Sequence, residues 1–253
     1  MIGDNYKYIF VHIPKNRGSS IEKELFDYYE NKDKIFNKDC YSMEYRGSLK
    51  KYGCKKHSTL RHIKTQLPLD KYNSYLKFSL VRNPYDRFIS CYYWSFYSDL
   101  FKLHILDKKI RRRLVRDICY KEDFLKIYNN AKSMSEQHIL CMDWADIISQ
   151  LFFARSQFQY ITLRKRNINV NYVLYLEHIN DGWEIICNKL NIVNNLEHFR
   201  KNENKKDYSF YYENQPEFID FVKGVYRKDF LKLRYNPNDI YEKPSRIILE
   251  GVV

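Results

Sequence analysis

The chain has 253 residues, and its 44 lysines and arginines exceed its 31 aspartates and glutamates, which gives a formal net charge of +13. This charge favours an anionic partner such as a phosphate, a nucleic acid or a sulfated or carboxylated glycan. The seven glycines, six prolines and 17% aromatic residues exclude a collagen-like or disordered chain. Without a repeat or a Ser/Gly linker, we expect one domain over residues 1–253.

No apolar run approaches the roughly 20 residues that a transmembrane helix needs, and the N-terminal apolar stretch is too short for a signal peptide. We therefore expect a soluble, cytoplasmic protein without a membrane anchor. The six cysteines are scattered, with no C-x-x-C pair and no histidine at zinc spacing. They predict reduced thiols and no metal site.

Two strand–loop–helix passages organise the first part of the chain. In the first, an apolar strand over 7–12 leads through the loop IPKNRGSS into a helix over 21–29. In the second, a strand over 76–81 leads into a helix with Pro84 at its first position. A short helix over 58–66 lies between the two passages.

Beyond these passages, apolar periodicity predicts further helices and two strands. The helices are expected over 101–116, 122–128, 146–153, 181–190 and 217–233, and the strands over 158–163 and 172–176. Strands that alternate with helices predict an α/β fold with a central parallel sheet covered by helices on both faces. Ligands bind such sheets at the carboxyl ends of the strands, where the loops of both passages lie.

The loop over 14–20 is the first candidate site. Small and turn-forming residues, Asn16, Gly18, Ser19 and Ser20, place backbone N–H groups at a helix N-terminus, where the helix dipole favours an anion. The lysine precedes the glycine, so the loop is neither a Walker A loop nor a Rossmann fingerprint. An ordinary strand-to-helix turn with an exposed lysine is the alternative interpretation.

Arg82, at the end of the second strand, is the second candidate. Its guanidinium and the hydroxyl of Ser90 on the following helix suit a second phosphate group. The alternative is that Arg82 pairs with Asp86 or Glu122 and that Ser90 faces a neighbouring helix.

At these two segments the sequence resembles the sulfotransferases that use 3′-phosphoadenosine 5′-phosphosulfate (PAPS). FVHIPKNRGSS resembles their 5′-phosphosulfate loop, and SLVRNPYDRFISCYY resembles their 3′-phosphate element. The resemblance is closest to the carbohydrate branch, with the heparan sulfate and uronyl 2-O-sulfotransferases, and extends from about Ile9 to Tyr235. It implies a P-loop-like sulfotransferase fold, PAPS as the sulfuryl donor, no metal, and an acceptor hydroxyl on a carbohydrate.

The resemblance also implies roles for single residues. The 5′-phosphosulfate would contact Lys15, Gly18, Ser19 and Ser20, with Asn16 and Arg17 in the same loop, and the 3′-phosphate would contact Arg82 and Ser90. HFRKNENKK resembles a late basic loop that closes over the nucleotide, which makes Arg200 and Lys201 candidate ligands, with a solvated turn as the alternative. The family usually has Thr and a small residue where Asn16 and Arg17 stand, and a positive φ at Arg17 would carry a steric cost.

Transfer to an alcohol needs a general base, because a neutral hydroxyl is a weak nucleophile. His57 is the candidate, since it stands just ahead of the second phosphate element, where the 2-O-sulfotransferase branch carries a base histidine. Lys15 would neutralise charge that develops on the leaving group. A surface histidine is the alternative interpretation of His57, and His62 and His138 are weaker candidates for the base.

The prediction of the acceptor and the two alternative functions rest on weaker sequence patterns. A basic stretch over 108–116 would attract a polyanionic glycan, and a solvated helix face is its alternative interpretation. The 24 tyrosines are scattered and no RNA-recognition motif occurs, so nucleic acid is not expected as the partner. Two other functions remain open: a phosphotransferase, which would need Mg²⁺ ligands, and a non-catalytic basic protein of this fold that binds a nucleotide or nucleic acid.

Overall fold

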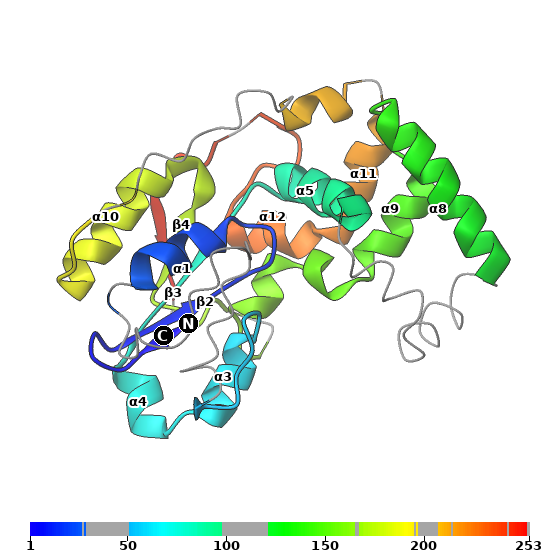
Figure 1. Cartoon of the computed structure of the whole chain (residues 1–253). Coiled ribbons are helices and arrows are strands. Elements are labelled where there is room, and N and C mark those ends of the chain that lie inside the picture. The colour runs from blue at the N-terminus through cyan, green and yellow to red at the C-terminus, as the bar shows by residue number, and fades with distance from the viewer. Residues whose placement is uncertain are drawn as a thin grey trace. The chain divides into compact units, whose positions relative to one another are not determined.

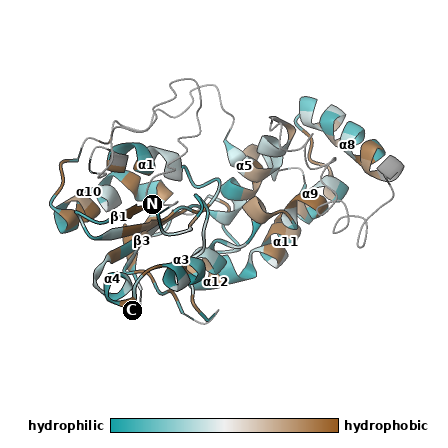
Figure 2. Cartoon of the chain, turned by 60° about the horizontal axis from the view of Figure 1, so that its bottom comes forward, coloured by the Kyte–Doolittle hydropathy of each residue, from teal (hydrophilic) through white to brown (hydrophobic). Residues whose placement is uncertain are grey.

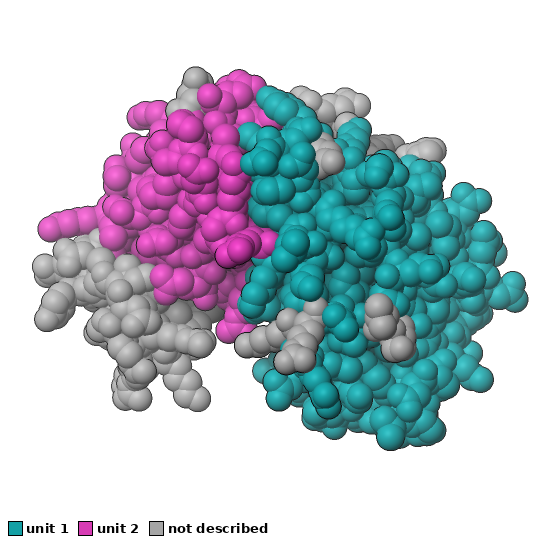
Figure 3. Space-filling model, turned by 180° about the vertical axis from the view of Figure 1, so that it is seen from behind, with its two compact units in different colours: residues 1–83, 156–205, 228–253 teal, residues 84–155, 206–227 magenta. Residues whose placement is uncertain are grey.

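A computed structural model of the chain (Figure 1) describes residues 1–26, 28, 51–97, 121–164, 167–194, 196, 207–213, 215–241 and 243–251. The helix expected over 101–116, with its basic stretch, and the candidate ligands Arg200 and Lys201 lie outside these residues. The chain divides into two units, of residues 1–83, 156–205 and 228–253 and of residues 84–155 and 206–227 (Figure 3). One domain over 1–253 stays a prediction.

A five-stranded sheet forms the centre of the first unit, in the order β1-β2-β3-β4-β5. Its strands are β1 (Ile2–Gly3), β2 (Tyr8–Val11), β3 (Leu76–Val81), β4 (Tyr172–Tyr175) and β5 (Ile248–Glu250). The three central strands are parallel, with Phe10 opposite Phe78 and Ser79 opposite Val173, whereas β1 and β5 pair antiparallel at the edges. The α/β prediction is confirmed, and the edge strands are an addition to it, since two and three residues are too few to show a period.

Helices cover both faces of this sheet. On one face, Phe78 contacts Trp183 of α10 (Ile179–Leu190), with ring centroids 6.2 Å apart. On the same side α1 (Gly18–Phe26) lies beside α10, and the Tyr28 hydroxyl meets the backbone of Val193 just beyond α10. In Figure 2 β3 is coloured as hydrophobic, as expected for a strand with helices on both of its faces.

The opposite face packs against α3 (Leu60–Gln66), α4 (Leu69–Ser74) and α12 (Arg227–Leu233). The buried Lys77 of β3 donates to the carbonyls of Tyr72 and Tyr75 at the end of α4, at 2.9 and 2.8 Å. The Tyr175 hydroxyl of β4 donates to the Leu233 carbonyl of α12 at 2.8 Å. Polar side chains on this face therefore tie the strands to the ends of helices.

The prediction of a strand over 158–163 is wrong. Residues there form a 3₁₀ helix, η2 (Gln157–Tyr160), which follows a first one, η1 (Phe152–Ala154). The backbone N–H groups of Gln157 and Phe158 donate to the buried carboxylate of Asp229, at 2.8 and 2.9 Å, so they are not available to a strand ladder. A short apolar run does not distinguish these two outcomes.

The second unit is helical. It contains α5 (Pro84–Tyr97), α8 (Lys121–Glu136), α9 (Met142–Ser149), η4 (Tyr208–Tyr211) and α11 (Pro216–Val225), whereas η3 (Leu176–His178) belongs to the first unit. The fully buried Trp144 stacks on Phe96 and contacts Phe124 and Tyr128, which joins α9 to α5 and α8. The single helix expected over 217–233 is two helices, α11 and α12, separated at Tyr226.

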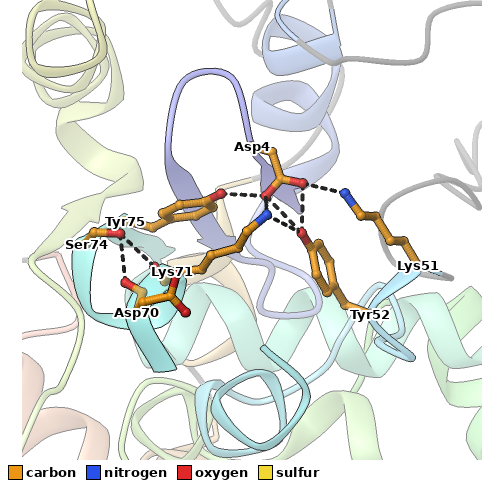
Figure 4. A network of polar contacts seen from close by, with 7 residues as sticks. All are labelled: Asp4, Lys51, Tyr52, Asp70, Lys71, Ser74 and Tyr75. Carbon is orange, nitrogen blue, oxygen red and sulfur yellow. Dashed lines mark hydrogen bonds and ion pairs between the residues drawn. The ribbon is translucent and has the colours of Figure 1, made fainter. Parts of the chain in front are cut away.

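Asp4, in the turn between β1 and β2, accepts hydrogen bonds from four side chains (Figure 4). The donors are Lys51 at 2.8 Å, Tyr52 at 2.7 Å, Lys71 at 3.0 Å and Tyr75 at 2.5 Å. Burial raises the pKa of the Asp4 carboxyl, but the four donors outweigh it and hold the pKa well below its usual range. One carboxylate thus fastens α4 and the segment before α3 to the sheet edge.

We expect Asp4→Asn to lower the free energy of unfolding by about 1–3 kcal/mol at pH 7, because two lysines and two tyrosines lose a charged acceptor. The carboxylate stabilises the fold above its unfolded pKa of about 3.9, and this contribution is lost as the pH falls further. Urea titrations at pH 7 and pH 3 measure both effects. Asp146→Asn, at an exposed position of α9, is the control. A wild type and an Asp4→Asn protein of equal stability at pH 7 would contradict this account.

Candidate functional site

The loop between β2 and α1 is sharply turned at two residues that are not glycine. Lys15 has φ 68° and Arg17 has φ 56°, the left-handed region that costs an ordinary residue about 1 kcal/mol or more. Arg17 therefore has the positive φ, with its steric cost, that the sequence raised as a question. The Ser20 N–H donates to the Arg17 carbonyl at 3.1 Å, which closes the first turn of α1.

Gly18 begins α1 against the ring of His12. A Cβ atom at position 18 would lie 2.6 Å from Cδ2 of His12, and this imidazole is buried and has little room to move. The close approach of helix and ring explains the glycine, which the sequence pattern had associated only with anion binding. Ser19, the next residue, is exposed.

A buried contact between a histidine and a glutamate lies under this helix start. Nδ1 of His12 and Oε1 of Glu22 are 2.8 Å apart, with the side chains 4% and 1% exposed. Burial lowers the pKa of His12, whereas the pKa of Glu22 is lowered against its burial by His12 and by Lys56. Nζ of Lys56 lies 3.2 Å from Glu22 Oε2 and donates to Ser19 Oγ at 3.3 Å. Lys56 thus compensates the carboxylate charge and reaches the loop as well.

His57 stands next to this pair. Its ring lies edge-on to that of His12, with centroids 4.6 Å apart, and its Nδ1 lies 3.1 Å from the His12 carbonyl oxygen. Because a carbonyl oxygen only accepts, this contact assigns the ring proton to Nδ1 and the lone pair to Nε2. Burial, together with His12 and Lys56, lowers the pKa of His57 to about 4. The ring is therefore neutral at pH 7.

Arg82, at the carboxyl end of β3, meets the loop. Its Nη1 donates to the Lys15 carbonyl at 3.0 Å, and the residue is only 3% exposed. The strands that precede the two segments, β2 and β3, are parallel neighbours, so their carboxyl ends share one sheet edge. The structure thus brings together the two main candidates of the sequence.

A third residue, Gln157, joins the same two segments from inside the protein. Its Oε1 accepts from Asn16 Nδ2 at 2.6 Å and from the Arg82 N–H at 3.0 Å, and its Nε2 donates to the Arg82 carbonyl at 2.8 Å. Asn16 Nδ2 also donates to the Leu80 carbonyl at 2.8 Å. The Asn16 side chain is thus buried, and its Nδ2 is hydrogen-bonded within the fold. A ligand contact at position 16 would therefore come from the main chain.

Asn83, the residue after Arg82, donates its N–H to Glu177 Oε1 at 2.7 Å and its Nδ2 to the Ile240 carbonyl at 3.3 Å. The remaining candidates of the sequence are placed as follows. Ser90 is half-buried on α5, in the second unit. His62 is exposed on α3, and His138 is exposed beyond α8 in the second unit. Sequence reasoning missed the parts played by Gln157, Glu22 and Lys56.

Comparison with known families decides the chemistry in general terms. A model of the sulfotransferase family matches residues 1–236. The chain belongs to this family. The searches of curated proteins and of solved structures found no match. As a sulfotransferase, the protein is a transferase for a sulfuryl group and takes a hydroxyl-bearing acceptor.

The cationic side chains and the helix N-terminus at this site suit a sulfuryl donor that is an anion. A lysine, an arginine and a helix N-terminus lie at one sheet edge, and each of them attracts negative charge.

Among the described residues, no group of three histidine, cysteine or acidic side chains is arranged to hold a metal ion. Within the same residues, no helix has the length and apolar character that crossing a membrane requires.

We expect the sulfotransferase to lose about 2 kcal/mol of stability between pH 7 and pH 5 through His57. Its folded pKa, about 4, lies below the unfolded value of about 6.5, so the unfolded state takes up the proton first as the pH falls. Urea titrations at the two pH values measure the loss. His57→Asn, which can still donate to the His12 carbonyl, should show a smaller difference between pH 7 and pH 5, and an equal difference would contradict the assignment.

Proposed function

We propose that this sulfotransferase uses PAPS to sulfate a hydroxyl group of a carbohydrate. The observation that supports the proposal most is the 3.0 Å contact between Arg82 Nη1 and the Lys15 carbonyl. It joins the loop that resembles a 5′-phosphosulfate loop to the strand end that resembles a 3′-phosphate element. Two cationic residues at one sheet edge suit a nucleotide that carries anionic groups at both its 5′ and its 3′ positions.

Each anionic group has candidate ligands. Lys15 and the start of α1, with Gly18, Ser19 and Ser20, would hold the 5′-phosphosulfate through charge and the helix N-terminus. Arg82 would hold the 3′-phosphate through its planar guanidinium, and Ser90 would add a hydroxyl donor. PAPS supplies the sulfuryl group and leaves adenosine 3′,5′-bisphosphate as the product.

His57 is the proposed general base. Its Nδ1 proton is committed to the His12 carbonyl, so Nε2 is the nitrogen that would accept the proton of the acceptor hydroxyl. The lowered pKa keeps this nitrogen unprotonated at neutral pH, and a bound anionic donor would raise the pKa towards neutrality. Lys15 would neutralise the negative charge that develops on the leaving oxygen.

The proposed acceptor is supported by charge, and the proposed role of the late basic loop by the resemblance. A net charge of +13 would attract an acidic glycan, and the basic stretch over 108–116 is a candidate for that contact. Arg200 and Lys201 remain candidate ligands of the nucleotide by their resemblance to the late loop. A carbohydrate acceptor is therefore proposed on the resemblance and on charge together.

Two measurements test the proposal in sequence. Adenosine 3′,5′-bisphosphate should raise the melting temperature of the protein, whereas equal concentrations of ATP and NAD should raise it much less. Transfer of radiolabelled sulfate from PAPS onto a panel of glycans, with simple phenols alongside, should then identify the acceptor. An absence of any shift with adenosine 3′,5′-bisphosphate would reject PAPS as the donor, and transfer to phenols but not to glycans would reject the carbohydrate acceptor.

A further inference from the structure

Gln157 links the two anion-binding segments, although it is distant from both in sequence. Its carboxamide makes three hydrogen bonds of 2.6 to 3.0 Å, one to the Asn16 side chain and two to the main chain of Arg82. The residue is 0% exposed, so no ligand in solution can touch it. Whatever Gln157 contributes to the site is therefore exerted through Asn16 and Arg82.

The bonding pattern requires a carboxamide. The oxygen accepts two donors while the nitrogen donates to a carbonyl, and an ionised glutamate of the same size can only accept. On the Asn16 side, the two protons of Nδ2 are divided between Gln157 and the Leu80 carbonyl of β3. Asn16 is thus fixed between Lys15 and Arg17, the two residues of this loop that hold unfavourable positive φ values.

Gln157 is itself held in place by a buried acid. The carboxylate of Asp229, on α12, accepts from the Ser156 hydroxyl at 2.6 Å and from the N–H groups of Gln157 and Phe158 at 2.8 and 2.9 Å. Asp229 is fully buried, and both of its oxygens take part in these contacts. The carboxamide therefore projects from a 3₁₀ turn whose position is set by α12.

We propose that Gln157 is a positioning residue that sets the distance and orientation between the Lys15 loop and Arg82. The proposal rests on the proposed function, because it assumes that these two segments bind the two ends of one nucleotide. Inside the protein Gln157 joins Asn16 to the main chain of Arg82, beside the bond from Asn16 to the Leu80 carbonyl, and at the sheet edge Arg82 contacts the Lys15 carbonyl. Loss of the inner link should leave each segment able to bind an anion, but no longer at the separation that a single nucleotide requires.

The mononucleotides with one phosphate distinguish positioning from stability. Adenosine 5′-phosphate engages only the loop and adenosine 3′-phosphate only Arg82, whereas adenosine 3′,5′-bisphosphate engages both. A nucleotide that binds both segments gains affinity only when the two are preorganised at the right separation. The ratio of the dissociation constants of the mononucleotides to that of the bisphosphate therefore reports the link, and a loss of folded protein lowers the active fraction for all three ligands without changing this ratio.

The experiment compares Gln157→Leu, Gln157→Asn and the exposed neighbour Gln159→Leu with the wild type by calorimetry. Both Gln157 variants should lower the ratio by about tenfold or more, whereas Gln159→Leu keeps it. Gln157→Asn retains the carboxamide but is one methylene shorter, so it serves if Gln157→Leu does not fold. An unchanged ratio in a folded Gln157 variant overturns the positioning role. A wild type that binds none of the nucleotides overturns the proposed function instead.

Discussion

Replacement of Arg82 by lysine is expected to weaken the binding of adenosine 3′,5′-bisphosphate by about 100-fold or more. Lysine keeps the positive charge but loses the planar guanidinium that can donate two parallel hydrogen bonds to a phosphate, and charge-assisted bonds contribute about 1.5–3 kcal/mol each. It also loses the donor that contacts the Lys15 carbonyl at 3.0 Å. Isothermal titration calorimetry of the two proteins measures the difference directly.

The matched control is Arg155→Lys, the same exchange at an exposed residue. Its affinity should remain within threefold of the wild type. Adenosine 5′-phosphate, which lacks the 3′-phosphate, should bind the Arg82→Lys protein nearly as well as the wild type. An Arg82→Lys protein that binds the bisphosphate with wild-type affinity would contradict the assignment of the 3′-phosphate to this residue.

The meeting of Lys15 and Arg82 could be predicted from the sequence because each follows an apolar strand. The strand over 76–81 matches β3 at both ends, and Pro84 begins α5 as expected from its fixed φ. Parallel neighbouring strands bring their carboxyl ends to one edge, so two local patterns were enough to predict one shared site.

Gln157 could not be predicted in the same way. A buried carboxamide has no period or spacing of its own, and its partners Asn16 and Arg82 lie 141 and 75 residues away. The local sequence also misled, because the apolar residues after it favour a strand, whereas Asp229 holds their N–H groups in a 3₁₀ turn. A long-range hydrogen bond to a side chain decides this segment, and no window along the sequence contains both partners.

The cluster around His57 was predicted only in part. His57 was chosen for its place before the second phosphate element, but nothing in the pattern showed that its ring would lie against His12 or bond to its carbonyl. Glu22 falls on the helix after the loop, four residues beyond Gly18, where an acid looks like an ordinary surface residue. Its burial against His12 and Lys56 follows from the close approach of α1 to β2, which is a property of packing.

Replacement of His57 by asparagine is expected to lower kcat by about 10²- to 10⁴-fold, the usual contribution of a general base. The asparagine amide can still donate to the His12 carbonyl, so the fold around His12 and Glu22 should be retained. The affinity for adenosine 3′,5′-bisphosphate should stay within threefold of the wild type, because His57 is proposed to act on the acceptor. Single-turnover transfer from radiolabelled PAPS, together with calorimetry, separates the two quantities.

The pH dependence of the transfer rate is a second, independent test of the role of His57. The dependence of kcat/KM on pH reports the free enzyme, in which burial lowers the pKa of His57 to about 4, so the rate should stay level from pH 8 to about pH 5 and fall only below that. The dependence of kcat reports the complex, in which the anionic nucleotide favours the protonated ring, so its acid limb should lie at higher pH. If His57→Asn keeps its turnover while His62→Ala loses it, the base is His62. If both keep it, the hydroxyl is activated without a histidine from this segment.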